Sequence, residues 1–175
     1  MAQMTDRNAS FRRITVVIVV WTFAVTVLRA LRMPNDFAET YWLLDYRFGF
    51  IKRGMVGSVC SGITSLLGIS MTPGIIVGLS LMMLAILSAV FLWVLMDLVR
   101  RHEWSGGAIV TALVFASSPF AVLCGHLAGY LDSFLYIAAV AAIALIMSGR
   151  PMAAAVIQVL ALLTHEAYIL TGYPL

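Results

Sequence analysis

The sequence predicts an all-α protein, a polytopic bundle of helices in a membrane. Three observations lead to this prediction. Hydrophobic residues make up 62% of the 175 positions and charged residues only 11%, whereas soluble domains carry about 25% charged residues. Mean hydropathy is +1.01. Apolar runs of about twenty residues recur along the chain, which is the length that a helix needs to cross a bilayer. We expect about five transmembrane helices in one domain.

The apolar runs define the expected elements in order. A short basic tail, residues 1–13, precedes a single helical membrane domain that covers 14–175. The outer loop after the first span ends in a Gly- and Ser-rich stretch, which is too weakly apolar for a span and suits an interfacial or re-entrant segment. The sequence "SSP" should kink the third span, because proline interrupts helical hydrogen bonding. The expected spans cover approximately 14–33, 74–96, 107–124, 131–147 and 152–171, and the outer loop covers 34–73.

The basic residues predict the orientation of these spans. With the N-terminus in the cytoplasm, six arginines fall on the cytoplasmic side, in agreement with the positive-inside rule. The same distribution, along the edges of apolar runs, excludes nucleic acid as a partner despite the pI near 9.1. The outer loop is an exception, since it carries three cations on the unfavoured side. The six cytoplasmic arginines are Arg7, Arg12, Arg13, Arg100, Arg101 and Arg150.

The stretch "YWLLDYRFGFIKRG" (41–54) holds the outer-loop cations beside Asp45 and several aromatic residues. A carboxylate can act as general base on a hydroxyl or hold a metal ion. Arg47, Lys52 and Arg53 could bind a phosphate, with arginine suited to bidentate contact. Aromatic side chains favour the headgroup level of a membrane. The stretch therefore indicates a site for an anionic lipid headgroup, and an ordinary interfacial loop with snorkelling cations is the alternative.

Four further polar residues accompany the outer face. His165 and Glu166 lie roughly 20 Å into the fifth expected span at 1.5 Å per residue, where ionisable groups are costly. We expect them to line a working cavity, while a structural ion pair with a cation such as Arg29 is the alternative. Asp132 begins the fourth span, where the helix dipole alone would favour an acid. His126 lies in the preceding turn, where a structural role is the simpler interpretation.

These residues resemble those of the GT-C class of polytopic membrane glycosyltransferases. The resemblance rests on the first span, on the outer-loop acid in "DYRFGFIKRGMVG", and on the later acid in "GYLDSFLY"; "THEAY" is also similar to segments of bacterial membrane proteins of this type. It implies a sugar donor carried on a polyprenyl phosphate and an outward-facing site in the bacterial inner membrane. The resemblance implies that Asp45 is the catalytic acidic residue of the first loop, and that Asp132 is the later acidic residue. The pairing of acids usual in that class is missing around Asp45, and seven or more spans are usual.

The sequence thus leaves three functions open. The first is transfer of a sugar from a polyprenyl-phosphate donor, with Asp45 as catalytic base and the seven other site residues in contact with substrate. The second is a transporter or flippase-like module for an anionic lipid or solute, and the third is a non-catalytic subunit of a membrane complex. No nucleotide or metal motif is present, so no cofactor is implied, and a divalent metal at Asp45 is the one exception to consider. The substrate contacts are Arg47, Lys52, Arg53, His126, Asp132, His165 and Glu166.

Overall fold

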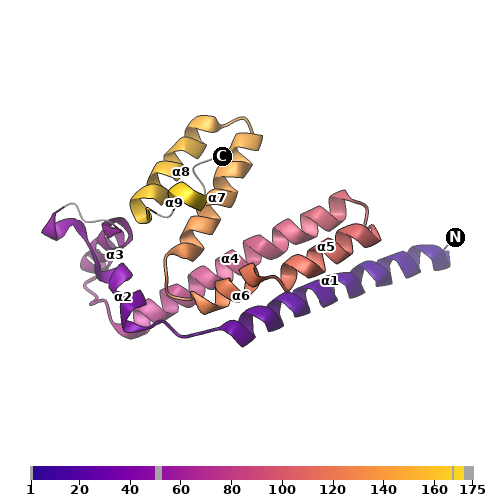
Figure 1. Ribbon diagram of the computed structural model, residues 1–175, viewed down its shortest axis with the longest axis horizontal. Helices are drawn as coiled ribbons and strands as arrows, with labels where there is room; N and C mark the ends of the chain where they lie inside the picture. Colours follow the sequence, from indigo (N-terminus) through magenta and orange to yellow (C-terminus); the bar gives the residue numbers. More distant parts are fainter. Residues whose placement is uncertain (1, 50–52, 167, 172–175) are drawn as a thin grey trace. The chain divides into compact units, whose positions relative to one another are not determined.

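The computed structural model describes residues 2–49, 53–166 and 168–171, and all regular elements in these ranges are helices (Figure 1). The prediction of an all-α fold is confirmed. The helices form two compact units, which are described separately. Unit 1 combines Met1–Arg32 with Ser88–His126, and unit 2 combines Met33–Leu87 with Leu127–Leu175.

Unit 1 contains the longest described helices of the chain. Its members are α1 (Ala2–Ala30), the second half of α4 (Pro73–Arg101), α5 (Gly106–Ala116) and α6 (Pro119–His126). Helix α1 begins at Ala2, so the expected basic tail is helical rather than separate from the first span. The predicted kink in the third span is confirmed, because α5 ends at Ala116 and α6 begins at Pro119.

Close backbone approach and stacked rings hold unit 1 together. Phe91 lies with its ring centroid 5.1 Å from those of both Phe23 and Phe120. A Cβ atom added to Gly125 would lie 2.4 Å from the carbonyl oxygen of Val27, so only glycine allows α6 to approach α1 this closely. Small residues are favoured in this way in membranes, where helices associate through packing rather than through the hydrophobic effect.

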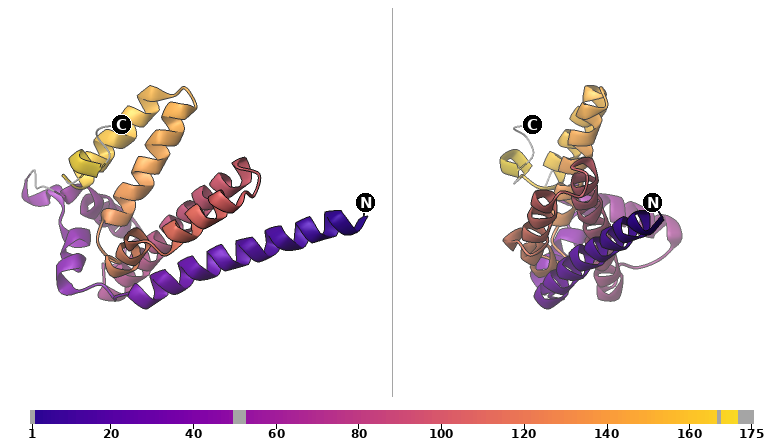
Figure 2. Two further views of the ribbon diagram at one scale, coloured as in Figure 1. Left: turned by 45° about the vertical axis from the view of Figure 1, so that its right-hand side comes forward. Right: turned by 90° about the vertical axis from the view of Figure 1, so that its right-hand side faces the viewer.

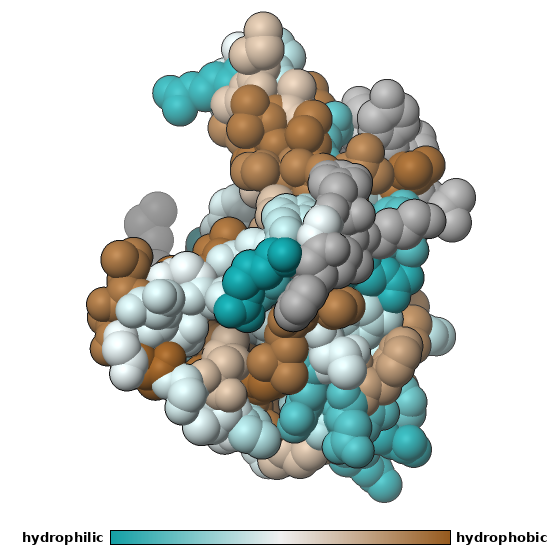
Figure 3. Space-filling model, turned by 90° about the vertical axis from the view of Figure 1, so that its left-hand side faces the viewer, coloured by the Kyte–Doolittle hydropathy of each residue, from teal (hydrophilic) through white to brown (hydrophobic). Residues whose placement is uncertain are grey.

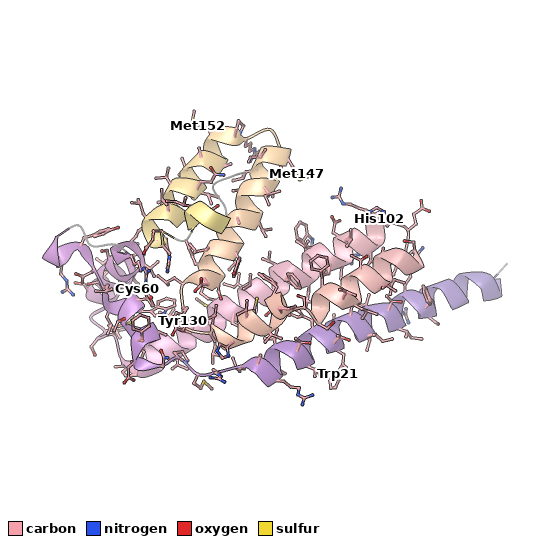
Figure 4. All side chains as sticks on the ribbon, viewed as in Figure 1. Trp21, Cys60, His102, Tyr130, Met147 and Met152 are labelled. Carbon is pink, nitrogen blue, oxygen red and sulfur yellow. The ribbon has the colours of Figure 1, made fainter. Side chains whose placement is uncertain are left out.

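Unit 2 combines the start of α4 with several shorter helices. Figure 1 and the left view of Figure 2 show α7 and α8 side by side as a hairpin. In Figure 4, Met147 and Met152 mark the closed end of this hairpin, and Tyr130 lies toward its open end. Besides the first part of α4, the unit contains α2 (Asp36–Leu43), the 3₁₀ helix η1 (Tyr46–Phe48), α3 (Gly54–Leu67), α7 (Asp132–Met147), α8 (Pro151–Thr164) and α9 (Tyr168–Thr171).

Sequence-coded stops and caps set the ends of these helices. The Asn35 side chain accepts a hydrogen bond of 2.8 Å from the backbone nitrogen of Ala38 and caps α2, which satisfies a donor that lacks a helical partner. Gly68 ends α3 in the left-handed conformation, with φ 65°. Pro73 and Pro151 begin α4 and α8, where the missing N–H of proline is harmless. The segment 34–73, which was expected to form an outer loop, is therefore mostly helical in its described residues, and α3 is its weakly apolar part.

The lengths of the helices support a membrane protein. Within the described residues, three helices are long and apolar enough to cross a membrane: Ala9–Ala30, Pro73–Arg101 and Gly106–His126. Helices α7 and α8 have 16 and 14 residues, or about 24 and 21 Å at 1.5 Å per residue, which is shorter than the roughly 30 Å of the hydrocarbon layer.

On the face shown in Figure 3, hydrophilic and weakly polar residues interrupt the hydrophobic surface.

Unit 2 packs around Tyr41 and Trp42 of α2. Both are buried, with exposed fractions of 6% and 4%, and they form a core cluster with Ile76 and Leu131. The Trp42 indole nitrogen donates a hydrogen bond of 2.8 Å to the carbonyl oxygen of Gly129. This bond joins the outer loop to the segment before α7, and it satisfies a polar group that would be costly to bury alone.

Helix α3 lies against the chain just before η1. A Cβ atom on Gly57 would lie 1.9 Å from the carbonyl oxygen of Leu44, so the two backbones touch there. The Ser58 hydroxyl accepts a hydrogen bond of 2.9 Å from the backbone nitrogen of Tyr46 and donates one of 2.7 Å to the carbonyl oxygen of Gly54. Helix α3 thereby fixes the backbone on both sides of residue 45.

Substitution of Gly57 tests this contact. Gly57→Ala should destabilise unit 2 by about 1–3 kcal/mol, as overpacking of a close contact does, because the Leu44 backbone must move. Gly62→Ala on the same helix is the matched control, since a Cβ atom there meets nothing within 4 Å. It should be neutral or stabilising by roughly 0.5–1 kcal/mol through its better helix propensity. Thermal melts of both variants in one detergent measure the difference, and equal melting temperatures would contradict the contact.

Candidate functional site

Asp45 is a buried carboxylate held by the residue two positions later. Its side chain is 2% exposed and caps η1, where it accepts a hydrogen bond of 3.0 Å from the backbone nitrogen of Arg47. The second carboxylate oxygen accepts one of 2.6 Å from the Arg47 Nε atom, and a terminal nitrogen of the guanidinium also contacts it. The Arg47 side chain is itself 73% exposed. The carboxylate is thus covered by protein and neutralised by a cation that faces outward.

These contacts set the charge of Asp45. The hydrogen bond from the Arg47 side chain lowers the pKa of the carboxyl below its usual range, against the opposing effect of burial, and the Ser61 hydroxyl lowers it further. Asp45 is therefore ionised at neutral pH. A carboxylate with a lowered pKa is a good hydrogen-bond acceptor but a weaker base than a free one. A change in its contact with Arg47 would change its basicity.

A cleft of about 270 Å³ opens beside Asp45 within unit 2. We name it the Asp45 cleft. Arg47 lies at its wall with the carboxylate, and four hydroxyl groups from α3 and from the segment after it line the remaining polar part: Ser61, Thr64, Ser65 and Ser70. Trp42, Leu43, Ile69 and Met71 supply apolar surface, and Gly57 lies at the wall. A carboxylate, a guanidinium, several hydroxyls and an indole together suit a ligand that carries many hydroxyl groups.

Arg53 occupies the centre of a second polar cluster in unit 2. Its Nε atom donates a hydrogen bond of 3.1 Å to one Glu166 oxygen, and a terminal nitrogen donates one of 2.8 Å to the other. The remaining terminal nitrogen donates to the Tyr41 hydroxyl, and the guanidinium lies 5.1 Å from the centroid of the Tyr41 ring. This bidentate geometry is the strongest that arginine makes with a carboxylate. We name the set of Arg53, Tyr41, His165, Glu166 and Asp132 the Arg53 cluster.

The charges within the Arg53 cluster are mutually adjusted. The hydrogen bond from Arg53 is the largest cause that lowers the pKa of Glu166 to about 2. Burial, and then the nearby Arg53 charge, lower the pKa of His165, while Glu166 and Asp132 act in the opposite direction. His165 Nδ1 lies 3.9 Å from a Glu166 oxygen, too far for a hydrogen bond. Glu166 and Arg53 are therefore the ionised pair, beside a neutral imidazole at pH 7.

Glu166 lies just beyond the end of α8 rather than inside that helix. Helix α8 ends at Thr164, His165 is extended with φ −160°, and Glu166 follows in a turn before α9. Its side chain is 44% exposed. The ion pair anticipated as the alternative to a working cavity is present, but its cation is Arg53 rather than Arg29. The expected depth of about 20 Å in the fifth span corresponds here to the far end of α8.

The other predicted site residues fall in different places. Asp132 is the first residue of α7 and acts electrostatically on both Arg53 and His165. His126 is exposed at the end of α6 in unit 1, so the contacts within unit 2 do not include it. Lys52 lies outside the described residues. Unit 2 thus brings six of the predicted residues into two groups: Asp45 with Arg47, and the Arg53 cluster with Arg53, Asp132, His165 and Glu166.

The hydroxyl groups of α3 are the site residues that sequence reasoning missed. Ser58, Ser61 and Ser65 are spaced by three and four positions, which places them on one face of a helix. That periodicity is visible in "GSVCSGITS", whereas the weak hydropathy of the segment by itself indicates no cleft. In the described part of the chain, no group of three or more His, Cys, Asp or Glu side chains could hold a metal ion. At Asp45, a cation would compete with the guanidinium that is already in contact.

The pKa of Glu166 predicts an acid-dependent contribution to stability. Because the folded-state pKa of about 2 lies below the ordinary value of 4.5, the contribution is full above pH 4.5 and is lost as the pH falls toward 2. Since the side chain is nearly half exposed, we expect roughly 0.5–1 kcal/mol. Glu166→Gln should therefore melt about 1–4 °C below the wild type at pH 7, and the gap should narrow at pH 2.5. A gap that widens in acid would contradict the assigned pair.

Comparison with known proteins identifies no relative of this chain. No protein-family model matches the sequence, and neither curated proteins nor solved structures show a significant similarity to it. The contacts and charges of the chain's own residues are therefore the basis for the functional proposal.

Proposed function

We propose that this chain is an inner-membrane protein of GT-C type that transfers a sugar from a polyprenyl-phosphate donor at the outer membrane face. The observation that carries this proposal is the Asp45 cleft, where a buried and ionised carboxylate adjoins four hydroxyl groups and an indole ring. Its volume of about 270 Å³ suits a single sugar ring. The carboxylate is also the acid that the resemblance assigns to catalysis.

The proposed reaction uses Asp45 at the acceptor. An acceptor hydroxyl oxygen bonds to the anomeric carbon of the sugar, while the bond from that carbon to the phosphate oxygen breaks. The polyprenyl phosphate leaves with the bonding electron pair, and the hydroxyl proton passes to the Asp45 carboxylate. Arg47 is mostly exposed, so its guanidinium can turn toward the departing phosphate. That movement would remove a hydrogen bond from Asp45 and raise its basicity when the proton arrives.

Arg47 is a better candidate than Arg53 for the contact with the donor phosphate. All three nitrogen atoms of the Arg53 guanidinium donate to Glu166 or Tyr41, which leaves it fewer free donors for a ligand. Arg47 has only Asp45 as its ion-pair partner among the described residues. Lys52, Asp132 and His165 remain proposed contacts of the donor, while His126 belongs to unit 1 and is left out of this proposal.

A topology of five spans with a cytoplasmic N-terminus accompanies this function, in which α8 is the fifth span and His165 and Glu166 follow its outer end. Within unit 1, the Arg12 guanidinium lies 5.6 Å from the Trp104 ring, so two segments expected in the cytoplasm lie at one end. The backbone nitrogen of Arg32 bonds to the oxygen of Gly125 at the other end. Within unit 2, Arg53 meets Glu166 at the open end of the α7–α8 hairpin. Each unit thus separates segments that are expected in the cytoplasm from segments that are expected on the outer side.

Reporter fusions test this orientation. A reporter fused after Arg101 should show cytoplasmic activity, and one inserted between residues 35 and 50 should show external activity, because the positive-inside rule places the two segments on opposite sides. Both readouts come from intact cells. An insertion between residues 102 and 105 serves as the internal control, since it must agree with the fusion after Arg101. Reversal of both locations would remove the outer-face assignment of the Asp45 cleft.

Substitution of Asp45 tests the proposed chemistry. Asp45→Asn keeps the shape of the side chain but cannot take a proton, so release of polyprenyl phosphate from a panel of polyprenyl-phosphate sugars should fall about 10²–10⁴-fold. The matched control is Asp36→Asn, since Asp36 is an exposed acid at the start of α2 in the same loop. The assay runs in detergent, with a thermal melt of each variant beside it.

The same assay separates the transporter alternative. An enzyme releases polyprenyl phosphate in detergent, whereas a transporter needs two sealed compartments. Unchanged release in Asp45→Asn, or movement of the donor only in sealed vesicles, would overturn the proposed transfer. The transporter alternative would then rest on the ionisable and partly exposed groups of the Arg53 cluster.

A further inference from the structure

The Arg53–Glu166 pair connects two parts of unit 2 that are 113 residues apart. Arg53 directly precedes α3 and adopts the left-handed conformation, with φ 69° and no side-chain cap of its own. Such a conformation is unfavourable for a residue with a Cβ atom and persists where surrounding contacts hold it. Glu166 and Tyr41 supply these contacts through every nitrogen of the guanidinium.

Glu166 has a rigid support. The backbone nitrogens of Tyr168 and Ile169 donate to the carbonyl oxygens of His165 and Glu166, with distances of 3.1 Å each. The Tyr168 side chain is fully buried and packs with Leu135 and Ala161 of α7 and α8. The turn that contains Glu166 therefore packs against the α7–α8 hairpin. This packing restricts movement of the Glu166 carboxylate.

Tyr41 provides the second support of Arg53. It is 6% exposed within the core cluster of unit 2, and its ring centroid lies 5.8 Å from that of Tyr130 and 6.2 Å from that of His165. The guanidinium is consequently bound on one side to α2 and on the other to the end of α8. Its position defines where α3 begins.

Helix α3 transmits this position to Asp45. Gly57 touches the Leu44 backbone, and the Ser58 hydroxyl holds the Tyr46 nitrogen. Ser61, one turn further along α3, lines the Asp45 cleft. A shift of the first turn of α3 would therefore move the backbone on both sides of residue 45 and one wall of the cleft.

We infer that Glu166 is a positioning residue for Asp45: its bidentate contact with Arg53 fixes the start of α3, and α3 holds the Asp45 cleft in shape. This inference rests on the proposed function for the role of Asp45, while the mechanical connection can be measured without it. Glu166 touches no reacting atom in this assignment. It acts through Arg53, and it should affect the rate of transfer more than the binding of the donor.

Cys60 offers a direct measurement of the connection. It lies on α3 between Gly57 and Ser61, is partly buried, and packs against the core cluster of unit 2; Figure 4 labels its position. With Cys124→Ala in every variant, Cys60 is the single thiol of the chain. Loosening of α3 should expose it. Loss of about 1 kcal/mol of docking energy corresponds to roughly fivefold faster alkylation by a maleimide.

The test compares Glu166→Ala, Glu166→Gln and the exchange of both charges, Arg53→Glu with Glu166→Arg. We expect faster alkylation of Cys60 in Glu166→Ala, a smaller increase in Glu166→Gln, and a return toward the wild-type rate in the double variant. Glu39→Ala is the control, because Glu39 forms no ion pair among the described residues. Where the alanine variant fails to fold, Glu166→Gln decides the outcome.

The kinetic test separates positioning from simple loss of stability. In the folded Glu166→Gln variant, kcat for transfer should fall about 10–100-fold, as misplacement of a catalytic group does, with KM for the donor nearly unchanged. Unchanged alkylation in both Glu166 variants would overturn the connection, whether or not the chain transfers sugars. Altered alkylation with an unchanged kcat would overturn the positioning role alone. Absence of transfer in the wild type would instead contradict the proposed function.

Discussion

The ion pair between Arg53 and Glu166 is the interaction on which the organisation of unit 2 depends. It binds the outer loop to the end of the α7–α8 hairpin, which the chain reaches only 113 residues later. An isolated surface ion pair contributes little to stability, because water competes for both charges. This pair differs in its geometry, since the carboxylate is held at both oxygens and the guanidinium is also in contact with a buried tyrosine. Its effect is to select one arrangement of segments rather than to add much stability.

Glycine determines where the remaining backbones meet. At Gly57, Gly125 and Gly129, an added Cβ atom would lie less than 3 Å from a neighbouring segment. In each case the neighbour belongs to a different helix or loop, so the small residue allows two elements to touch directly. Such contacts replace the hydrophobic driving force that lipid does not supply. The polar side chains can then occupy fixed positions, because the backbones that carry them are already in contact.

The sequence predicted the helical class and the kink before Pro119, because each has a local cause in composition or proline chemistry. It did not predict that α3 is a helix that lines a cleft, since hydropathy alone underrates a segment of serine and glycine. The sequence also could not identify the ion-pair partner of Glu166. A carboxylate far along the chain has several cations within possible reach, and only the tertiary arrangement distinguishes Arg53 from Arg29. The helix lengths of α7 and α8 likewise depend on where His165 and Gly149 end them.

The separation of Arg53 and Glu166 along the chain also has a consequence for biogenesis. At a synthesis rate of about 5–20 residues per second, Arg53 leaves the ribosome roughly 6–23 s before Glu166. During that interval Arg53 lacks the carboxylate of Glu166, its ion-pair partner in the folded chain. Asp45 faces no such delay, because Arg47 follows it by two residues. Unit 2 should therefore mature in two stages: a locally neutralised turn first, and closure onto the hairpin once α8 has been inserted.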